Sequence, residues 1–167
     1  MCELFEIRKY DPRDLEQCRS LWKELVMCHR EIYQDPNIGG DNPEEYFDKH
    51  LAEFGPELIW VAIHNSRIVG FMGLIIKENE ADIEPLIVSK IYRSKGIGEK
   101  LIHTAIDHAQ NIGIRFLNAK PVARNIDAIK FYHKLGFTKL GHIELFIDFF
   151  DYKWKGGPKI FGCSFDY

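Results

Sequence analysis

Apolar residues follow two patterns along this chain, and each pattern predicts one type of secondary structure. Residues 3–10 alternate around Phe5 and Ile7, which is typical of a half-buried strand. Asp11-Pro12 predicts the start of a helix, because aspartate caps free N–H groups and proline fits the first turn. One face of that helix is lined by Leu15, Cys18, Leu21, Trp22, Leu25 and His29.

The middle of the chain predicts a second helix followed by three strands. Asn42-Pro43 marks the start of the helix, and Gly55-Pro56 marks its end. The runs that follow are apolar and are separated by short polar turns, as in an antiparallel sheet. The three strands are expected near residues 58–64, 67–77 and 81–88.

The second half of the chain begins with a long helical pattern. Its apolar positions recur at three- and four-residue spacings over about 97–112, and Gly113 follows the last turn. The remaining elements are expected as a strand at 114–119, a helix at 126–135, and strands near 137–149 and 158–165. The turn before the last strand is expected at Gly156-Gly157-Pro158.

This order of elements predicts an α/β (α+β) fold with a mixed, mostly antiparallel sheet and flanking helices. The strand–helix–strand unit at 81–119 requires a right-handed crossover to a parallel neighbour. Pro85 cannot donate to a strand ladder, so it predicts an irregularity or bulge. With 167 residues, 46% hydrophobic, the chain suits a single domain over 1–167, in which 151–167 adds a C-terminal strand.

Bulk properties narrow the function classes. The formal net charge of −3 and pI of about 6.2 argue against a general nucleic-acid binder. We expect no membrane partner and a cytoplasmic location, because the sequence contains neither an apolar run of spanning length nor a signal peptide. The cysteines, which show no paired spacing and are expected to be free thiols, are Cys2, Cys18, Cys28 and Cys163.

A short basic glycine turn carries most of the functional information. An apolar run ends at Val88, and a helical pattern begins at Ile97. A helix N-terminus with nearby glycines favours a phosphate, because backbone N–H groups and the helix dipole point at it. A dinucleotide fingerprint would need glycine where Leu101 stands, and the sequence contains no nucleoside-triphosphate loop. The turn therefore predicts a different phosphorylated ligand.

Two motifs in order resemble those of the GNAT acetyltransferases. The first is Arg93-x-x-Gly96-x-Gly98. The second reads Asn125-x-x-Ala128-x-x-Phe131-Tyr132-x-x-x-Gly136-Phe137. The resemblance covers roughly residues 3–150 and implies direct transfer from acetyl-CoA to a primary amine, without a metal. It also implies that Pro85 marks a bulge where two parallel strands splay apart and leave backbone groups for pantetheine.

The resemblance assigns residues to the CoA site. Backbone N–H groups near the splay are expected to stabilise the thioester oxygen. Asn125 is expected both to cap its helix and to contact the CoA arm. The positions expected to bind CoA are Leu86, Ile87, Val88, Arg93, Ser94, Lys95, Gly96, Ile97, Gly98 and Asn125.

Acetyl transfer needs a proton acceptor and a proton donor. A lysine-like amine has a pKa of roughly 10.4 and must lose a proton before it attacks. Glu84 lies nine residues before Arg93 and resembles in spacing the catalytic glutamate of spermidine/spermine-type members. Asp82 is the alternative base, on the same strand face. Tyr132 matches the family tyrosine that donates a proton to the CoA sulfur.

The acceptor amine is left open. Residues 31–57 contain eight acids and one lysine, a net charge of −7 that leaves +4 on the rest of the chain. This suits a cationic amine on a small molecule or peptide, and it also suits an ordinary solvated surface. The alternative functions are a non-catalytic CoA sensor and an interaction module.

The aromatic C-terminal segment fits a ligand wall, and it fits core packing or a subunit contact, as in a homodimer, better. Its residues are Phe146, Phe149, Phe150, Tyr152 and Trp154. The seven histidines show no metal-ligand spacing.

Overall fold

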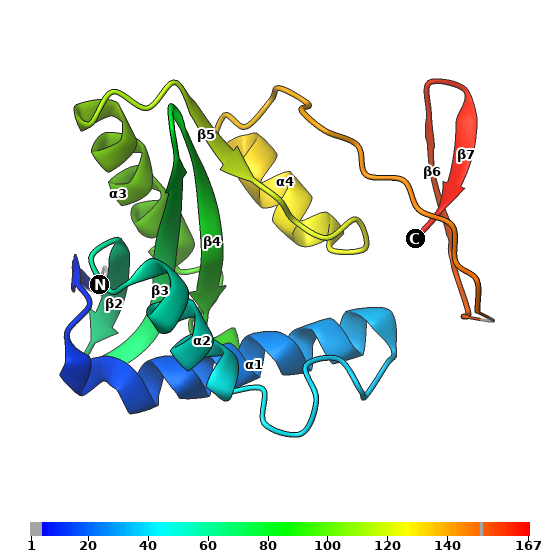
Figure 1. Cartoon of the computed structure of the whole chain (residues 1–167). Helices are drawn as coiled ribbons and strands as arrows, with labels where there is room; N and C mark the ends of the chain where they lie inside the picture. The colour runs from blue at the N-terminus through cyan, green and yellow to red at the C-terminus, as the bar shows by residue number, and fades with distance from the viewer. Residues whose placement is uncertain (1–4, 151) are drawn as a thin grey trace. The chain divides into compact units, whose positions relative to one another are not determined.

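The computed structural model describes residues 5–150 and 152–167 (Figure 1). It divides into two compact units, Met1–Lys120 and Pro121–Tyr167, and each is described by itself. The expectation of a single domain stays a prediction.

The first unit is built on a five-stranded sheet of order β1-β2-β3-β4-β5. Neighbouring strands are antiparallel except for the parallel pair β4 and β5. This confirms the predicted mixed, mostly antiparallel sheet. The strands are β1 Glu6–Lys9, β2 Ile59–His64, β3 Arg67–Lys77, β4 Glu80–Val88 and β5 Phe116–Ala119.

The third helix of this unit begins where the sequence predicts, and the first two begin a few residues after their predicted starts. A 3-10 turn over Pro12–Asp14 leads into the first helix, and the Asp11 carboxylate accepts a hydrogen bond from the Arg13 N–H at 3.0 Å. The Asp14 carboxylate in turn accepts a hydrogen bond from the Asp11 N–H at 2.9 Å, which completes a capping box. The helices are α1 Leu15–Tyr33, α2 Glu45–Phe54 and α3 Ile97–Asn111.

The two sides of the sheet carry different helices. Phe71 of β3 belongs to a buried cluster with Cys18 and Leu21 of α1 and Phe47 of α2. Strand side chains alternate, so Met72 faces the opposite side, where α3 contacts β2, β3 and β4. Helices α1 and α2 therefore cover one face of the sheet, and α3 covers the other.

The predicted irregularity at Pro85 is a bulge. Met72 pairs with Leu86 and Leu74 pairs with Ile83, so Gly73 alone opposes both Glu84 and Pro85. A Cβ on Gly73 would lie 2.6 Å from the Glu84 carbonyl oxygen, which explains why glycine occupies this position.

The predicted splay follows the bulge. The parallel pairing of β4 with β5 runs from Glu80–Phe116 to Ile83–Ala119. Among the described residues, no strand pairs with this edge of β4 beyond Ile83. The residues after the bulge keep their pairing with β3 but leave an open sheet edge.

The second unit differs from the expected strands. Helix α4 covers Ile126–Lys134, close to its predicted range. A hairpin follows, with β6 at Gly156–Ile160 and β7 at Cys163–Asp166. The expected turn at Gly156-Gly157-Pro158 is therefore part of β6, and the real turn is at Phe161-Gly162, both with positive φ.

The prediction of a strand at 137–149 is wrong. None of residues 137–149 is in a strand. A strand requires a partner backbone as well as an apolar pattern. Within this segment Leu145, Ile147 and Phe149 are 66%, 77% and 86% exposed.

Candidate functional site

The loop after β4 is anchored to the end of that strand. A 3-10 turn at Lys90–Tyr92 follows Val88, and the Arg93 Nε donates to the Val88 carbonyl at 3.0 Å. The Arg93 Nη1 also lies 3.8 Å from the Cys28 sulfur on α1. Arg93 therefore fixes the loop in addition to bringing positive charge to it.

The glycine turn leads directly into α3. Ser94 and Gly96 have φ of 62° and 83°, in the left-handed region. Gly96 is the N-cap of α3, so no side chain caps the first N–H groups of the helix. No atom lies within 4 Å of the point where a Cβ of Gly96 would be. Lys95 places its ammonium 5.2 Å from the Tyr92 ring. This leaves an open approach to a helix N-terminus beside two cations, as a phosphate requires.

The predicted CoA-binding positions of β4 differ in exposure. Ile87 is 2% exposed, while Leu86 and Val88 are half-buried. Ile97, at the start of α3, is 1% exposed. Ile87 and Ile97 can therefore offer a ligand only backbone groups.

Asp82 is buried and held by three donors. Its carboxylate accepts from Lys120 at 2.6 Å, Lys77 at 2.9 Å and Asn118 at 3.1 Å. Burial acts to raise the pKa of Asp82, but these hydrogen bonds outweigh it and lower the pKa to about 2. A carboxylate of this kind is a poor proton acceptor near neutral pH.

Glu84 has a different environment. Its side chain is exposed at the bulge, and no described residue donates a hydrogen bond to its carboxylate. Its charge contributes to the raised pKa of Lys77, after the larger effect of the hydrogen bond to Asp82. Of the two candidate bases, Glu84 is the one with an accessible carboxylate.

His50 on α2 lies beside the same bulge and was missed from the sequence. Its Nε2 is 3.3 Å from the point where a Cβ of Gly73 would lie, and that point is 2.6 Å from the Glu84 carbonyl oxygen. His50 is 7% exposed and contacts the rings of Trp22 and Phe54. The available signal was a histidine three residues after Phe47, on the buried face of the helix.

The second unit contains the other motif. The Asn125 side chain caps α4 by accepting from the Ala128 N–H at 3.1 Å, as predicted. Tyr132 contacts the rings of Phe131 and Phe137. Burial raises the pKa of Tyr132 to about 12, so the hydroxyl keeps its proton at neutral pH.

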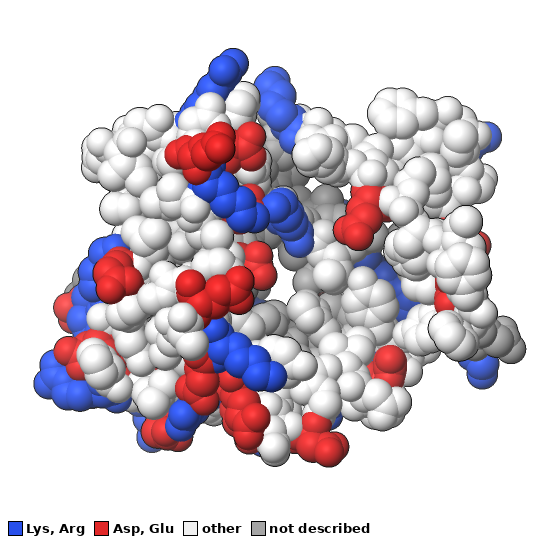
Figure 2. All heavy atoms as spheres, viewed as in Figure 1, with Lys and Arg blue, Asp and Glu red and all other residues white. Residues whose placement is uncertain are grey.

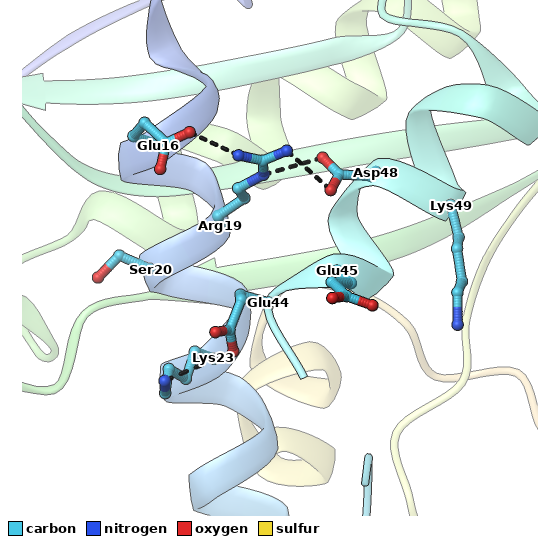
Figure 3. Close-up of a pocket in the computed structure, with 8 residues that line it drawn as sticks. All are labelled: Glu16, Arg19, Ser20, Lys23, Glu44, Glu45, Asp48 and Lys49. Atoms are coloured by element: carbon cyan, nitrogen blue, oxygen red, sulfur yellow. Dashed lines mark hydrogen bonds and ion pairs between the residues drawn. The ribbon is translucent and has the colours of Figure 1, made fainter. Parts of the chain in front are cut away.

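A charged groove of about 710 Å³ lies between α1 and α2 (Figure 3). Arg19 holds Asp48 through two hydrogen bonds of 3.0 and 2.9 Å, and Lys23 lies 3.5 Å from Glu44. Acidic and basic side chains intermingle over these helices in Figure 2. Cations of α1 therefore balance part of the acidic segment's charge.

Cys18, Cys28 and Cys163 are free thiols, and Cys2 lies outside the described range. Across 5–150 and 152–167, no group of three or more histidine, cysteine or acidic residues could hold a metal ion. No helix in these ranges has the length and apolar character to cross a membrane.

The family profile described as Acetyltransferase (GNAT) family matches residues 22–137, which include β2 to β5 and α4. The chain belongs to the GNAT acetyltransferase family. The match spans both the glycine turn at Arg93–Gly98 and the motif that begins at Asn125.

Curated proteins that are similar to this chain include two that are named as acetyltransferases. An uncharacterized N-acetyltransferase of Methanocaldococcus jannaschii is 31% identical over 56% of this chain and 45% of that protein. An L-methionine sulfoximine/L-methionine sulfone acetyltransferase of Salmonella typhimurium is 23% identical over 79% of each chain. A spore coat polysaccharide biosynthesis protein of Bacillus subtilis is 24% identical over 80% of this chain. The chain spans 47% of the length of the Bacillus subtilis protein and 45% of the length of the Methanocaldococcus jannaschii protein.

Solved structures support the GNAT fold. A GNAT acetyltransferase of Staphylococcus aureus superposes with a TM-score of 0.67 at 24% identity, covering 83% of this chain and 87% of that chain. The aminoglycoside N-acetyltransferase AAC(6')-Iy, in complex with a bisubstrate analogue of CoA, superposes with a TM-score of 0.63 at 16% identity. That alignment covers 87% of this chain and 98% of the enzyme.

Proposed function

We propose that this protein is an N-acetyltransferase that transfers the acetyl group of acetyl-CoA directly to a primary amine. The observation that carries the proposal is the bulged, unpaired edge of β4, followed after the loop at 89–96 by the open N-terminus of α3. The edge offers backbone hydrogen bonds to an extended chain, and the helix start offers N–H groups to phosphates. An acyl carrier with a peptide-like arm and a pyrophosphate needs both the strand edge, for its arm, and the helix start, for its phosphates.

The proposed CoA site follows these two features. Backbone groups of Leu86, Ile87 and Val88 would bind the arm and the thioester oxygen. Phosphates would meet the loop and the first turn of α3, and Asn125 would contact the arm as in the family motif. The loop and helix positions assigned to the phosphates are Arg93, Ser94, Lys95, Gly96, Ile97 and Gly98.

Glu84 is the proposed proton acceptor. Its exposed carboxylate attracts a cationic amine and takes its proton, directly or through a water. Asp82 is assigned a different role, because its oxygens are already engaged by Lys77, Lys120 and Asn118. It holds the ends of β4 and β5 together beside the site.

Tyr132 is the proposed donor to the departing sulfur. Its pKa of about 12 lies well above the roughly 8.5 of an ordinary thiol. Complete proton transfer to the thiolate is therefore uphill, and donation of a strong hydrogen bond during C–S cleavage fits this hydroxyl better. The assignment rests on the family motif and on the protonated state of the side chain.

The acceptor is proposed to be a cationic small molecule or a peptide amine. The support is the acidic segment 31–57, although Glu44 and Asp48 of that segment are ion-paired. The names of similar proteins include acetyltransferases of amino-acid analogues, of aminoglycosides and of a ribosomal-protein alanine. A cytoplasmic location, a homodimer and a single-domain organisation remain part of the proposal.

The experiment is an acceptor screen with acetyl-CoA, in which release of the CoA thiol is followed. The panel holds polyamines, amino acids, aminoglycosides and peptides with free N-termini. We expect amine-dependent thiol release with at least one class. Tight acetyl-CoA binding without release would instead indicate a CoA sensor, and absence of binding would indicate an interaction module.

A further inference from the structure

Acetylation of an ammonium ion removes two protons from one nitrogen. The first leaves before the amine attacks the thioester carbon, because a protonated amine has no lone pair. The second leaves after the C–N bond has formed, because the nitrogen of the tetrahedral intermediate is positively charged. The proposed function assigns one acceptor, Glu84, and therefore leaves one proton without a receiving group.

His50 is the titratable side chain that α2 brings to the bulge. Its Nε2 and the Glu84 carbonyl oxygen lie 3.3 Å and 2.6 Å from the same point beside Gly73. Asp82, two residues before Glu84 on β4, has its carboxylate occupied by two lysines and an asparagine. His50 thus reaches, from α2, the backbone of the bulge that contains Glu84.

The ring nitrogens of His50 are available. Among the described residues, none forms a hydrogen bond or ion pair with its side chain. His50 is 7% exposed, and neither of its ring nitrogens is among the fully enclosed polar atoms of the described residues that lack a partner. Most buried polar side-chain atoms in proteins have a hydrogen-bond partner. The unbonded ring nitrogens of His50 are therefore unusual for a side chain that serves only to pack the core.

The charge state of His50 suits a proton acceptor. Burial lowers its pKa below the usual value, and the negative charge of Glu53 only partly opposes this effect. Its neighbour on α1 is the uncharged Trp22. A neutral imidazole has one nitrogen with a free lone pair.

We propose that His50 is a second proton acceptor of this site, which takes the proton from the nitrogen after it has attacked the acetyl carbon. The proposal rests on the proposed acetyltransferase function. Glu84 takes the first proton, the C–N bond forms, His50 Nε2 takes the second, and the C–S bond breaks. The departing thiolate then takes one proton from solvent while Glu84 and His50 each release one to solvent, so the overall reaction releases one proton.

The test uses the 167-residue chain and chemical rescue. His50→Ala should lower kcat by ~10²-fold or more with the best acceptor from spermidine, L-lysine, kanamycin and a peptide with a free N-terminus. Imidazole added at fixed pH should restore at least ~10-fold, and substituted imidazoles of higher pKa should restore more. His50→Gln keeps a polar side chain but accepts no proton near neutral pH, so it should be as slow as His50→Ala.

His108→Ala is the matched control. His108 lies on α3, has a ring contact with Trp60 at 5.0 Å, and also has a pKa lowered by burial. Its replacement should leave kcat unchanged, with or without imidazole.

Three outcomes would contradict the inference. Unchanged kcat in His50→Gln, or a loss in His50→Ala that no imidazole restores, would overturn the role of His50 alone. Failure of the wild-type chain to release thiol from acetyl-CoA with every amine would overturn it together with the proposed function.

Discussion

At the scale of single residues, two carboxylates on one strand have opposite environments. Asp82 is 4% exposed and bound by three donors, whereas Glu84 is exposed at the bulge. The sequence predicted both as candidates, because both lie on one face of a strand. It could not separate them, because Asn118 of β5 and Lys120 just after it reach Asp82 from far along the chain.

Replacement of the two carboxylates should separate stability from catalysis. Asp82→Asn should lower the free energy of unfolding at pH 7 by about 2 kcal/mol, since a folded-state pKa of about 2 lies below the ordinary 3.8. The stabilisation is present above pH 3.8 and lost as pH falls toward 2. Urea unfolding at pH 7 and pH 3 should therefore show a difference between wild type and variant that shrinks in acid.

Glu84→Gln is the counterpart. We expect it to leave the unfolding free energy at pH 7 within ~0.5 kcal/mol of wild type, because the side chain is exposed. Its kcat should fall by ~10²-fold or more. A wild-type kcat in this variant would remove Glu84 from the chemistry.

At the scale of elements, the strand–bulge–helix unit was largely predictable. Pro85 indicated the bulge, and Gly96 indicated the start of α3, because both act through local backbone geometry. The segment 137–149 was predicted as a strand and is not one. Its apolar pattern is local information, but a strand depends on a partner that lies elsewhere.

Gly73 tests the importance of the bulge. Gly73→Ala would place a Cβ 2.6 Å from the Glu84 carbonyl, so β3 and β4 must move apart. We expect a loss of ~1–3 kcal/mol in unfolding free energy and weaker acetyl-CoA binding by calorimetry. Gly141→Ala is the control, because no atom lies within 4 Å of its added Cβ. Equal effects of the two substitutions would argue against a close approach at the bulge.

At the scale of the whole molecule, charge is distributed unevenly along the chain. Residues 31–57 carry −7 and the remainder +4. The structure qualifies this picture, since Lys90 lies 3.7 Å from Glu31 and Arg19 holds Asp48. Composition revealed the imbalance, but pairing between distant segments was not visible in the sequence.

The acidic segment should act on the acceptor's KM. For a cationic acceptor, KM should rise with ionic strength, because the Debye length is ~8 Å at physiological salt. Replacing Glu31, Asp35, Glu44 and Glu45 by amides should raise KM further and change kcat less. Steady-state kinetics over a salt series would measure both effects.

A charge-matched control changes four acids outside the segment. They are Glu6, Asp107, Glu144 and Asp166. This variant should keep the wild-type KM at physiological salt. Equal shifts in the two quadruple variants, or a neutral or anionic best acceptor, would make the segment an ordinary solvated surface.

The binding of acetyl-CoA to wild type and Gly98→Val, measured by calorimetry, tests the central claim most directly. Gly98 lies in the first turn of α3, where a branched side chain would block the approach of a phosphate to the backbone. His103→Val places the same side chain on an exposed position of the same helix and controls for helix stability. The account predicts binding weakened more than tenfold, over ~1.4 kcal/mol, in Gly98→Val alone. Equal affinity in folded Gly98→Val and wild type would contradict it.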